Sequence, residues 1–140
     1  MNNLIIKRSQ LIEAKIVGTP TTGKKYPFTQ VPNISRNNIV IYGFEAFTAT
    51  QLAVTPNGTS VIPATAQANV IITFVDTDNV ERIFQIPYYT LISSLNGGFI
   101  KMAKPFVLNL TKSFTQLVST TNVTASDAIS LNLYYSIVGE

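Results

Sequence analysis

Seven carboxylates are the main resource for acid–base or metal chemistry in this chain, because its 140 residues include no histidine and no cysteine. Histidine is the most frequent general acid or base at neutral pH. Nucleophilic and metal chemistry depends largely on histidine, cysteine and clustered carboxylates. This composition argues against an enzyme, and it predicts no catalytic residue, no cofactor and no metal ligand. It favours a protein that acts through its surface and its assembly.

The densest group of oxygen donors is Asp76, Asp78 and Asn79, which resembles the opening of a calcium-binding loop. Val80 follows directly, and the glycine and the distal bidentate glutamate of such a loop are missing. Acidic residues at the tip of a hairpin commonly form the turn itself. We favour the turn, with calcium as the alternative.

Residues 18–25 fit the spacing G-x-x-x-x-G-K of a phosphate-binding loop. That motif requires a serine or threonine after the lysine, and then a helix whose N-terminus faces the phosphates. Here a second lysine, Lys25, takes the hydroxyl position, and Tyr26-Pro27 predicts an extended segment. The segment is therefore interpreted as a linker.

Paired tyrosines and nearby phenylalanines could form a platform on which a sugar stacks: Tyr88-Tyr89, Tyr134-Tyr135, Phe44 and Phe47. Aromatic residues that alternate along strands belong more often to a core or to a subunit interface. We therefore place Tyr88, Tyr89 and Tyr134 at a candidate interface, and glycan recognition remains the alternative.

The net charge of +3 is unevenly distributed. Residues 1–36 hold six basic residues against Glu13 alone, a local charge of +5, and residues 37–140 carry four basic against six acidic residues, a local charge of −2. A basic N-terminal segment can contact nucleic acid or an acidic neighbour, but a solvated arm is the favoured interpretation. Binding to nucleic acid is not expected, because the basic residues do not interleave with aromatic residues on one sheet face.

The first residues do not predict a secretory signal, since Lys7-Arg8 ends the apolar run Leu4-Ile5-Ile6 after three residues. No stretch approaches the roughly 20 apolar residues of a membrane span. We expect synthesis in a host cytoplasm without secretion and no membrane contact. The lack of cysteine fits that compartment.

These residues should be positioned by β-strands, which the sequence predicts because short runs rich in Val, Ile, Phe, Tyr and Thr alternate with Pro, Gly and Asn. Residues 70–75 and 80–86 flank an Asp/Asn tip and predict a hairpin, with Arg82, Phe84 and Ile86 on one face of the second strand. After Pro87, one helical turn is the most that we expect. Residues 107–110 and 114–118 predict a second hairpin or a sheet corner. Candidate strands cover residues 4–8, 10–17, 26–31, 38–48, 69–76, 80–87, 104–110, 114–119 and 129–138.

About nine strands, with turns at intervals of roughly 8–12 residues, predict an all-β, jelly-roll-like antiparallel β-sandwich with under about 15% helix. We expect an N-terminal arm and linker over residues 1–25 and a sandwich domain over residues 26–140. The predicted core consists of Ile41, Phe44, Ile72, Phe74, Phe84, Ile86, Leu108, Leu110, Phe114, Leu117, Leu131 and Leu133.

The order of segments between residues 39 and 135 supports a resemblance. They are IVIYGFEAF at 39–47, ITFVD at 72–76, IPYYTL at 86–91, KSFT at 112–115 and LNLYY at 131–135. This order resembles small jelly-roll structural proteins of tailed-bacteriophage virions, including auxiliary capsid and head proteins of phages that infect Bacteroidota. The resemblance covers about two-thirds of the chain. It implies a symmetric homo-oligomer, such as a trimer or a pentamer, that contacts other capsid proteins in the virion.

We therefore expect a non-catalytic virion structural protein, an auxiliary or minor capsid or head component. The alternative is a receptor- or glycan-binding head module of a phage fibre. A mean hydropathy of +0.25 is high for a soluble monomer and favours assembly. The arm is expected to pair with a neighbouring subunit or with the shell, and its alternative is an edge strand of its own sheet. The arm's candidate interface residues are Leu4, Ile5, Ile6, Lys7, Arg8, Lys24 and Lys25.

Overall fold

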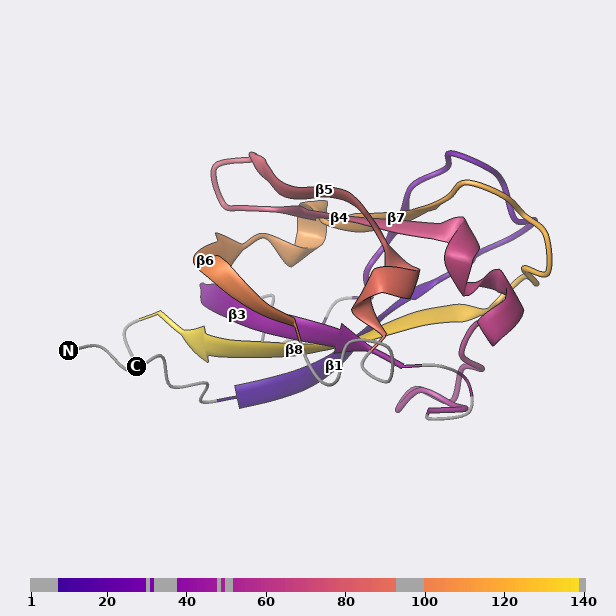
Figure 1. Ribbon diagram of the computed structural model, residues 1–140, viewed down its shortest axis with the longest axis horizontal. Helices are drawn as coiled ribbons and strands as arrows, with labels where there is room; N and C mark the ends of the chain where they lie inside the picture. Colours follow the sequence, from indigo (N-terminus) through magenta and orange to yellow (C-terminus); the bar gives the residue numbers. More distant parts are fainter. Residues whose placement is uncertain are drawn as a thin grey trace.

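Two four-stranded antiparallel sheets pack against each other in the computed structural model (Figure 1). The structure describes residues 8–29, 31, 38–47, 49, 52–92 and 100–138, without the side chains of Phe84 and residues 100–103. Sheet A has the strand order β1-β8-β3-β6, and sheet B has the order β2-β7-β4-β5. The strands are β1 (Arg8–Lys15), β2 (Tyr26–Pro27), β3 (Ile39–Ala46), β4 (Val70–Val75), β5 (Glu81–Pro87), β6 (Ile100–Leu108), β7 (Phe114–Leu117) and β8 (Ala128–Ile137).

The predicted all-β sandwich is confirmed. The helical elements among the described residues are three short 3₁₀ helices, Ala64–Asn69, Tyr88–Leu91 and Leu110–Lys112. The single turn expected after Pro87 is the second of these. Short β-branched and aromatic runs between turn-forming residues provide too little chain for a stable α-helix and favour pleated strands.

The core lies between the sheets, where aromatic side chains from both sheets meet. The ring of Phe74 on β4 lies 5.5 Å from that of Phe44 on β3 and 5.8 Å from that of Phe28, measured between ring centroids. All three are almost fully buried, and burying such a side chain contributes roughly 1.5–3 kcal/mol. Ten of the twelve predicted core residues are buried, Ile86 is partly buried against the core, and the Phe84 side chain lies outside the described part.

The predicted hairpin forms from β4 and β5, but the alternation predicted for β5 is wrong. Ile72 pairs with Ile86 and Phe74 pairs with Ile83, so β5 contains one more residue than β4 between these pairs. The extra residue makes a bulge at Gln85, which has a φ of 53° and whose N–H donates to Thr73 Oγ1. As a result, Ile83 and Ile86 both pack against the core.

The segment between β6 and β7 is a sheet corner and not a hairpin. β6 belongs to sheet A and β7 to sheet B, and the 3₁₀ helix Leu110–Lys112 joins them. β6 begins at Ile100, earlier than the predicted residue 104.

The prediction of a separate arm over residues 1–25 is wrong for residues 8–25, because this segment is part of the sandwich. β1 pairs with β8 along its whole length, from Arg8 opposite Tyr135 to Lys15 opposite Ala128. Its inward side chains Ile12 and Ala14 belong to the core. An edge strand of the same sheet, the alternative, is therefore what residues 8–15 form. Residues 1–7 lie outside the described residues.

The segment predicted to be a linker is also hydrogen-bonded to the sandwich. Gly23 N–H donates to the carbonyl oxygen of Leu117 on β7 at 2.9 Å, and Thr21 N–H donates to the hydroxyl of the buried Tyr26 at 3.0 Å. Residues 26–27 then form β2, which pairs with β7.

Candidate functional site

Two of the predicted interface residues, Lys24 and Lys25, border a surface cavity of about 570 Å³ together with Lys15. Lys25 Nζ lies 4.5 Å from the centroid of the Phe114 ring, and Lys24 Nζ lies 5.4 Å from that of Tyr26. These cation–π contacts hold two exposed ammonium groups over aromatic faces. No carboxylate is among the described residues that line the cavity, so it can attract an acidic group.

The other predicted basic residues do not join this cluster. Arg8 is exposed at the start of β1, and Lys15 stands at the end of the same strand, roughly 23 Å away at the usual rise per residue. Leu4, Ile5, Ile6 and Lys7 lie outside the described residues.

The structure does not bring the predicted tyrosines together. Tyr88 is fully buried, and its hydroxyl donates to the carbonyl oxygen of Ser130 at 2.8 Å. This burial raises the pKa of Tyr88. The prediction that Tyr88 contributes to a surface interface or a sugar platform is therefore wrong, because the 3₁₀ helix after Pro87 turns its ring into the core. Tyr89, the next residue, is half exposed.

Tyr134 lies instead on the outer face of sheet A, on β8. Its hydroxyl donates to Glu45 Oε1, and this hydrogen bond, together with partial burial, raises the pKa of Tyr134. Asn132 Nδ2 lies 3.4 Å from the same carboxylate oxygen. Glu45 is therefore engaged by two side chains of the neighbouring strand.

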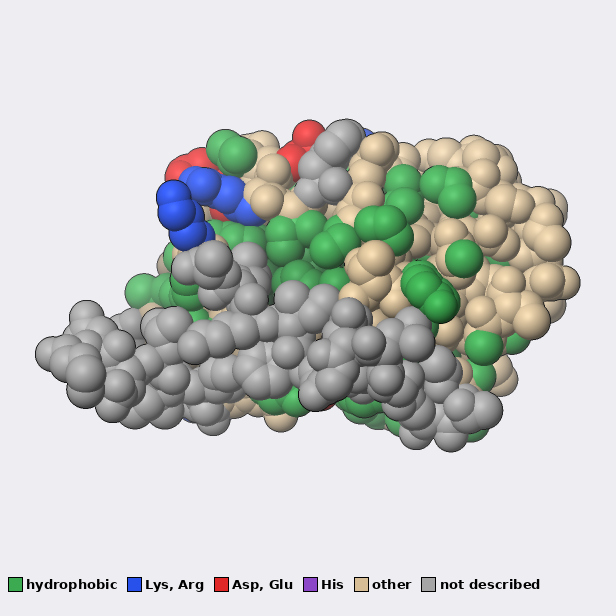
Figure 2. Space-filling view, in the orientation of Figure 1, with side chains coloured by type: hydrophobic (Ala, Val, Ile, Leu, Met, Phe, Trp, Pro, Cys, Tyr) green, Lys and Arg blue, Asp and Glu red, His purple; other side chains and the backbone are tan. Residues whose placement is uncertain are grey.

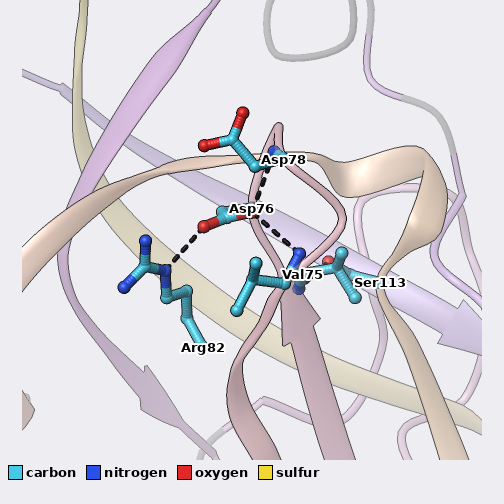
Figure 3. Close-up of polar contacts among 6 residues, drawn as sticks. Val75, Asp76, Asp78, Arg82 and Ser113 are labelled. Atoms are coloured by element: carbon cyan, nitrogen blue, oxygen red, sulfur yellow. Dashed lines mark hydrogen bonds and ion pairs between the residues drawn. The ribbon is translucent and has the colours of Figure 1, made fainter.

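The group around Asp76 forms the turn between β4 and β5, as favoured from the sequence (Figure 3). Asp76 Oδ1 accepts from the N–H groups of Asp78 and Val80 at 2.8 and 2.9 Å, and Arg82 Nε donates to Oδ2 at 2.6 Å. The Arg82 hydrogen bond, followed by that of the Val80 N–H, holds the pKa of Asp76 below its ordinary value. Both carboxylate oxygens of Asp76 therefore accept hydrogen bonds from the turn and from the beginning of β5.

A buried serine completes this region. Ser113 Oγ accepts from the N–H of Val75 at 3.0 Å and donates to the carbonyl oxygen of Asn109 at 2.9 Å. It joins the corner before β7 to the end of β4 (Figure 3).

The segment with the phosphate-loop spacing is followed by β2 and not by a helix. Without a helix N-terminus after Lys25, the segment lacks the backbone donors that hold a phosphate in such loops. The fold therefore supports a connection between β1 and β2 that is hydrogen-bonded to β7, and not a phosphate-binding loop.

A site that sequence reasoning missed lies along β1, where two adjoining cavities of about 450 and 190 Å³ share Gln10, Leu11 and Pro56. We call the pair the β1 groove. The larger cavity is also lined by Ser9, Phe47, Leu52 and Asn132, and the smaller by Ile12, Glu13, Thr29, Val31, Asn57 and Ser130.

Three polar side chains meet in the smaller cavity because of two features of the fold. Glu13 and Ser130 are direct partners in the β1–β8 register, so their side chains share the outer face of sheet A. Residues 54–60 form a small hairpin in which Gly58 has a φ of 82°, and Asn57 at its tip donates from Nδ2 to Glu13 Oε1 at 2.6 Å. Glu13 is 6% exposed and Ser130 fully buried.

The sequence offered one signal for this site, a carboxylate between the apolar residues Ile12 and Ala14 within a strand. Its partners Asn57 and Ser130 are distant in the chain, and no periodicity connects them. From the sequence, Glu13 stands out only as the single acidic residue of a basic segment.

The described residues contain no group of three or more side chains suited to hold a metal ion. No helix within the described ranges is long and apolar enough to cross a membrane. No protein-family model, no curated protein and no solved structure matches this chain.

Proposed function

We propose that this chain is a jelly-roll structural protein of a tailed-bacteriophage virion, an auxiliary or minor capsid or head component without catalytic activity. It would act as a closed homo-oligomer, a trimer or a pentamer, that contacts other capsid proteins.

The observation that carries this proposal is the nesting of the strand pairs. β1 pairs with β8, β2 with β7, β3 with β6 and β4 with β5, as in one long two-stranded ribbon folded across itself. Alternate pairs of the ribbon belong to alternate sheets, and the pairs β3–β8 and β4–β7 join them. Eight strands in two such sheets are typical of the jelly roll, an architecture used by viral capsid domains.

The distribution of charge also favours assembly. On the face shown in Figure 2, most of the visible charged side chains lie over the tip of the β4–β5 hairpin, and no charged side chain is visible at the opposite end. The loop of residues 118–126 at that end contains no charged residue. Surfaces that become buried between subunits are depleted in charge at their centre.

The cavity between Lys15, Lys24 and Lys25 is the candidate contact for a capsid neighbour. Three exposed ammonium groups without a carboxylate among the described lining residues would pair with an acidic surface. The acidic partner expected for Lys24 and Lys25 from the sequence is kept, but its contact lies on the body of the sandwich and not on a free arm.

The proposal is tested on purified phage particles. Mass spectrometry of particles from the phage that encodes this chain should detect it at a fixed copy number, and native mass spectrometry of the purified chain should give one closed oligomer. A chain found only in the infected cell and never in particles would reject the proposal.

A matched pair of charge reversals tests the contact. Lys25→Glu should reduce incorporation into particles roughly tenfold or more, because it places a carboxylate against an acidic neighbour. Lys104→Glu reverses an exposed lysine at a different cavity, which Asp76 and Arg82 also line, and should leave incorporation unchanged. Equal incorporation of both variants would contradict the role of this cavity.

A further inference from the structure

The β1 groove contains a nearly buried carboxylate whose hydrogen-bonding capacity is largely unused. Glu13 is 6% exposed, and among the described residues its side chain has one partner, the Nδ2 group of Asn57. No lysine or arginine that the structure describes forms an ion pair with it. A carboxylate removed from water is stabilised by positive charge and by several donors, and here one donor is present.

Ser130 provides a second and independent observation at the same place. Its hydroxyl is fully buried, and no group of the described residues forms a hydrogen bond with Oγ. Native proteins rarely leave such a group unpaired, because an unsatisfied buried hydroxyl costs about 1–3 kcal/mol. Ser130 lines the smaller cavity beside Glu13, so a molecule in that cavity would lie against both residues, and a change of the Ser130 rotamer would turn Oγ towards it.

The other polar groups of the cavity indicate the charge and the hydrogen-bonding groups that a bound molecule should have. The Asn57 amide nitrogen gives one of its two N–H groups to Glu13, and the Gln10 amide nitrogen gives one to the carbonyl oxygen of Leu11. The other N–H groups of these amides and the hydroxyls of Ser130 and Thr29 are neutral, whereas the second oxygen of Glu13 carries negative charge. Because Glu13 is the one charged side chain among the described residues that line this cavity, the site favours a cation over an anion. A calcium ion takes about six to eight oxygen ligands, and the described lining residues offer one carboxylate among them.

We propose that the smaller cavity of the β1 groove binds an alkylammonium or alkylguanidinium group. The cationic nitrogen donates to Glu13, Asn57 Oδ1 and Ser130 Oγ. Its alkyl stem lies along Leu11 and Pro56, which both cavities share, towards Phe47 and Leu52 in the larger cavity. This inference is independent of the proposed role in the virion, because it rests on the groove alone.

The direct test is an NMR titration of the ¹⁵N-labelled full chain with propylammonium and ethylguanidinium chloride at constant ionic strength. Saturable shifts should appear at the backbone amides of Glu13, Asn57 and Ser130. Tetramethylammonium chloride is the matched control, since it has the charge but no N–H donor, and it should cause no saturable shift. No saturable shift with either probe, or equal shifts with the control ion, would overturn the proposal.

Glu13→Gln removes the charge and keeps an oxygen acceptor for Asn57, so it should weaken binding of both probes about tenfold or more. Glu45→Gln is the matched control, because Glu45 lies on the same face of sheet A but is engaged by Tyr134, and it should bind as the wild type does. Undiminished binding by Glu13→Gln would overturn the proposal. Tighter binding of glucose than of propylammonium would also overturn it, because it would identify a neutral polyol site.

The cation could come from a free amine or from a basic side chain of a polypeptide. An acetylated and amidated Gly-Arg-Gly peptide separates these sources. Binding tighter than that of ethylguanidinium would indicate a polypeptide ligand, and binding equal to or weaker than it would indicate a free small cation.

Discussion

The tip of the β4–β5 hairpin and the β1 groove each combine a nearly buried carboxylate with a fully buried serine, and they differ in how completely these groups are paired. Asp76 accepts three hydrogen bonds, and Ser113 both donates and accepts. Glu13 accepts one hydrogen bond, and Ser130 Oγ has no partner among the described residues.

For the two carboxylates, the difference follows from how far apart in the chain their surroundings are. Every partner of the Asp76 side chain lies within six residues of it, so the turn that creates the site also completes it. The β1 groove is assembled from β1, β8 and the hairpin of residues 54–60, whose relative placement is fixed by the whole sandwich. A buried polar group at such a junction of distant segments, if it lacks a hydrogen-bond partner from nearby residues, can bind a ligand.

Asp76→Ala should cause the largest loss of stability of the substitutions discussed here, because it leaves two backbone N–H groups and Arg82 without their acceptor. Since the folded pKa of Asp76 is lowered, its contribution to the free energy of unfolding is complete above the ordinary value of 3.8 and is lost as pH falls through the folded value. Urea unfolding between about pH 6 and pH 2 should show this acid-dependent loss in the wild type and less of it in the variant.

The control is Asp78→Ala, on the same turn, whose side chain is exposed. It should keep both the stability and the acid dependence of the wild type. If Asp76→Ala retained the full acid dependence, the assignment of this effect to Asp76 would be wrong.

Ser113→Ala should lower the free energy of unfolding by about 1–3 kcal/mol, because the N–H of the buried Val75 loses its acceptor and the carbonyl of Asn109 keeps only the Lys112 N–H. Urea denaturation at neutral pH measures the change. Ser9→Ala, at an exposed position of β1, serves as the control and should change stability by less than about 0.5 kcal/mol.

Apart from the controls, Ser130→Ala should change stability least and in the opposite direction, raising the free energy of unfolding by up to about 1 kcal/mol in the absence of amines. The substitution removes a buried hydroxyl that has no described partner, and no other group loses a hydrogen bond. A loss as large as that of Ser113→Ala would show that the two serines are equivalent and would remove the distinction between the two regions.

Local pattern was enough to predict the strands, the β4–β5 hairpin and most of the core, because alternation identifies which face of a strand is apolar. It does not identify the partner strand, so β1 was assigned to a free arm although its apolar face covers the same core as β8. The bulge at Gln85 depends on Thr73 across the hairpin and has no signal in β5 itself.

The candidate site was less predictable than the fold. Charge alone is enough to single out Lys24 and Lys25, but Lys15 borders the same cavity only because the end of β1 lies beside residues 28–29. Tyr88 was misplaced because a tyrosine beside a proline gives no indication of which way its ring turns. No sequence pattern indicates that Glu13 and Ser130 lie side by side, since this depends on the pairing register of β1 and β8, the first and last strands of the fold.

That register also determines the order in which the molecule can fold. The β4–β5 hairpin pairs two segments that are neighbours in the chain. In sheet A, β1 pairs with β8, so this sheet is complete only after the long stretch of chain between these two strands has been ordered. Sandwiches dominated by such distant pairings fold in roughly milliseconds to seconds. Until β8 arrives, the apolar face of β1 stays uncovered on a newly made chain, and this is the interval in which the protein is most exposed to aggregation.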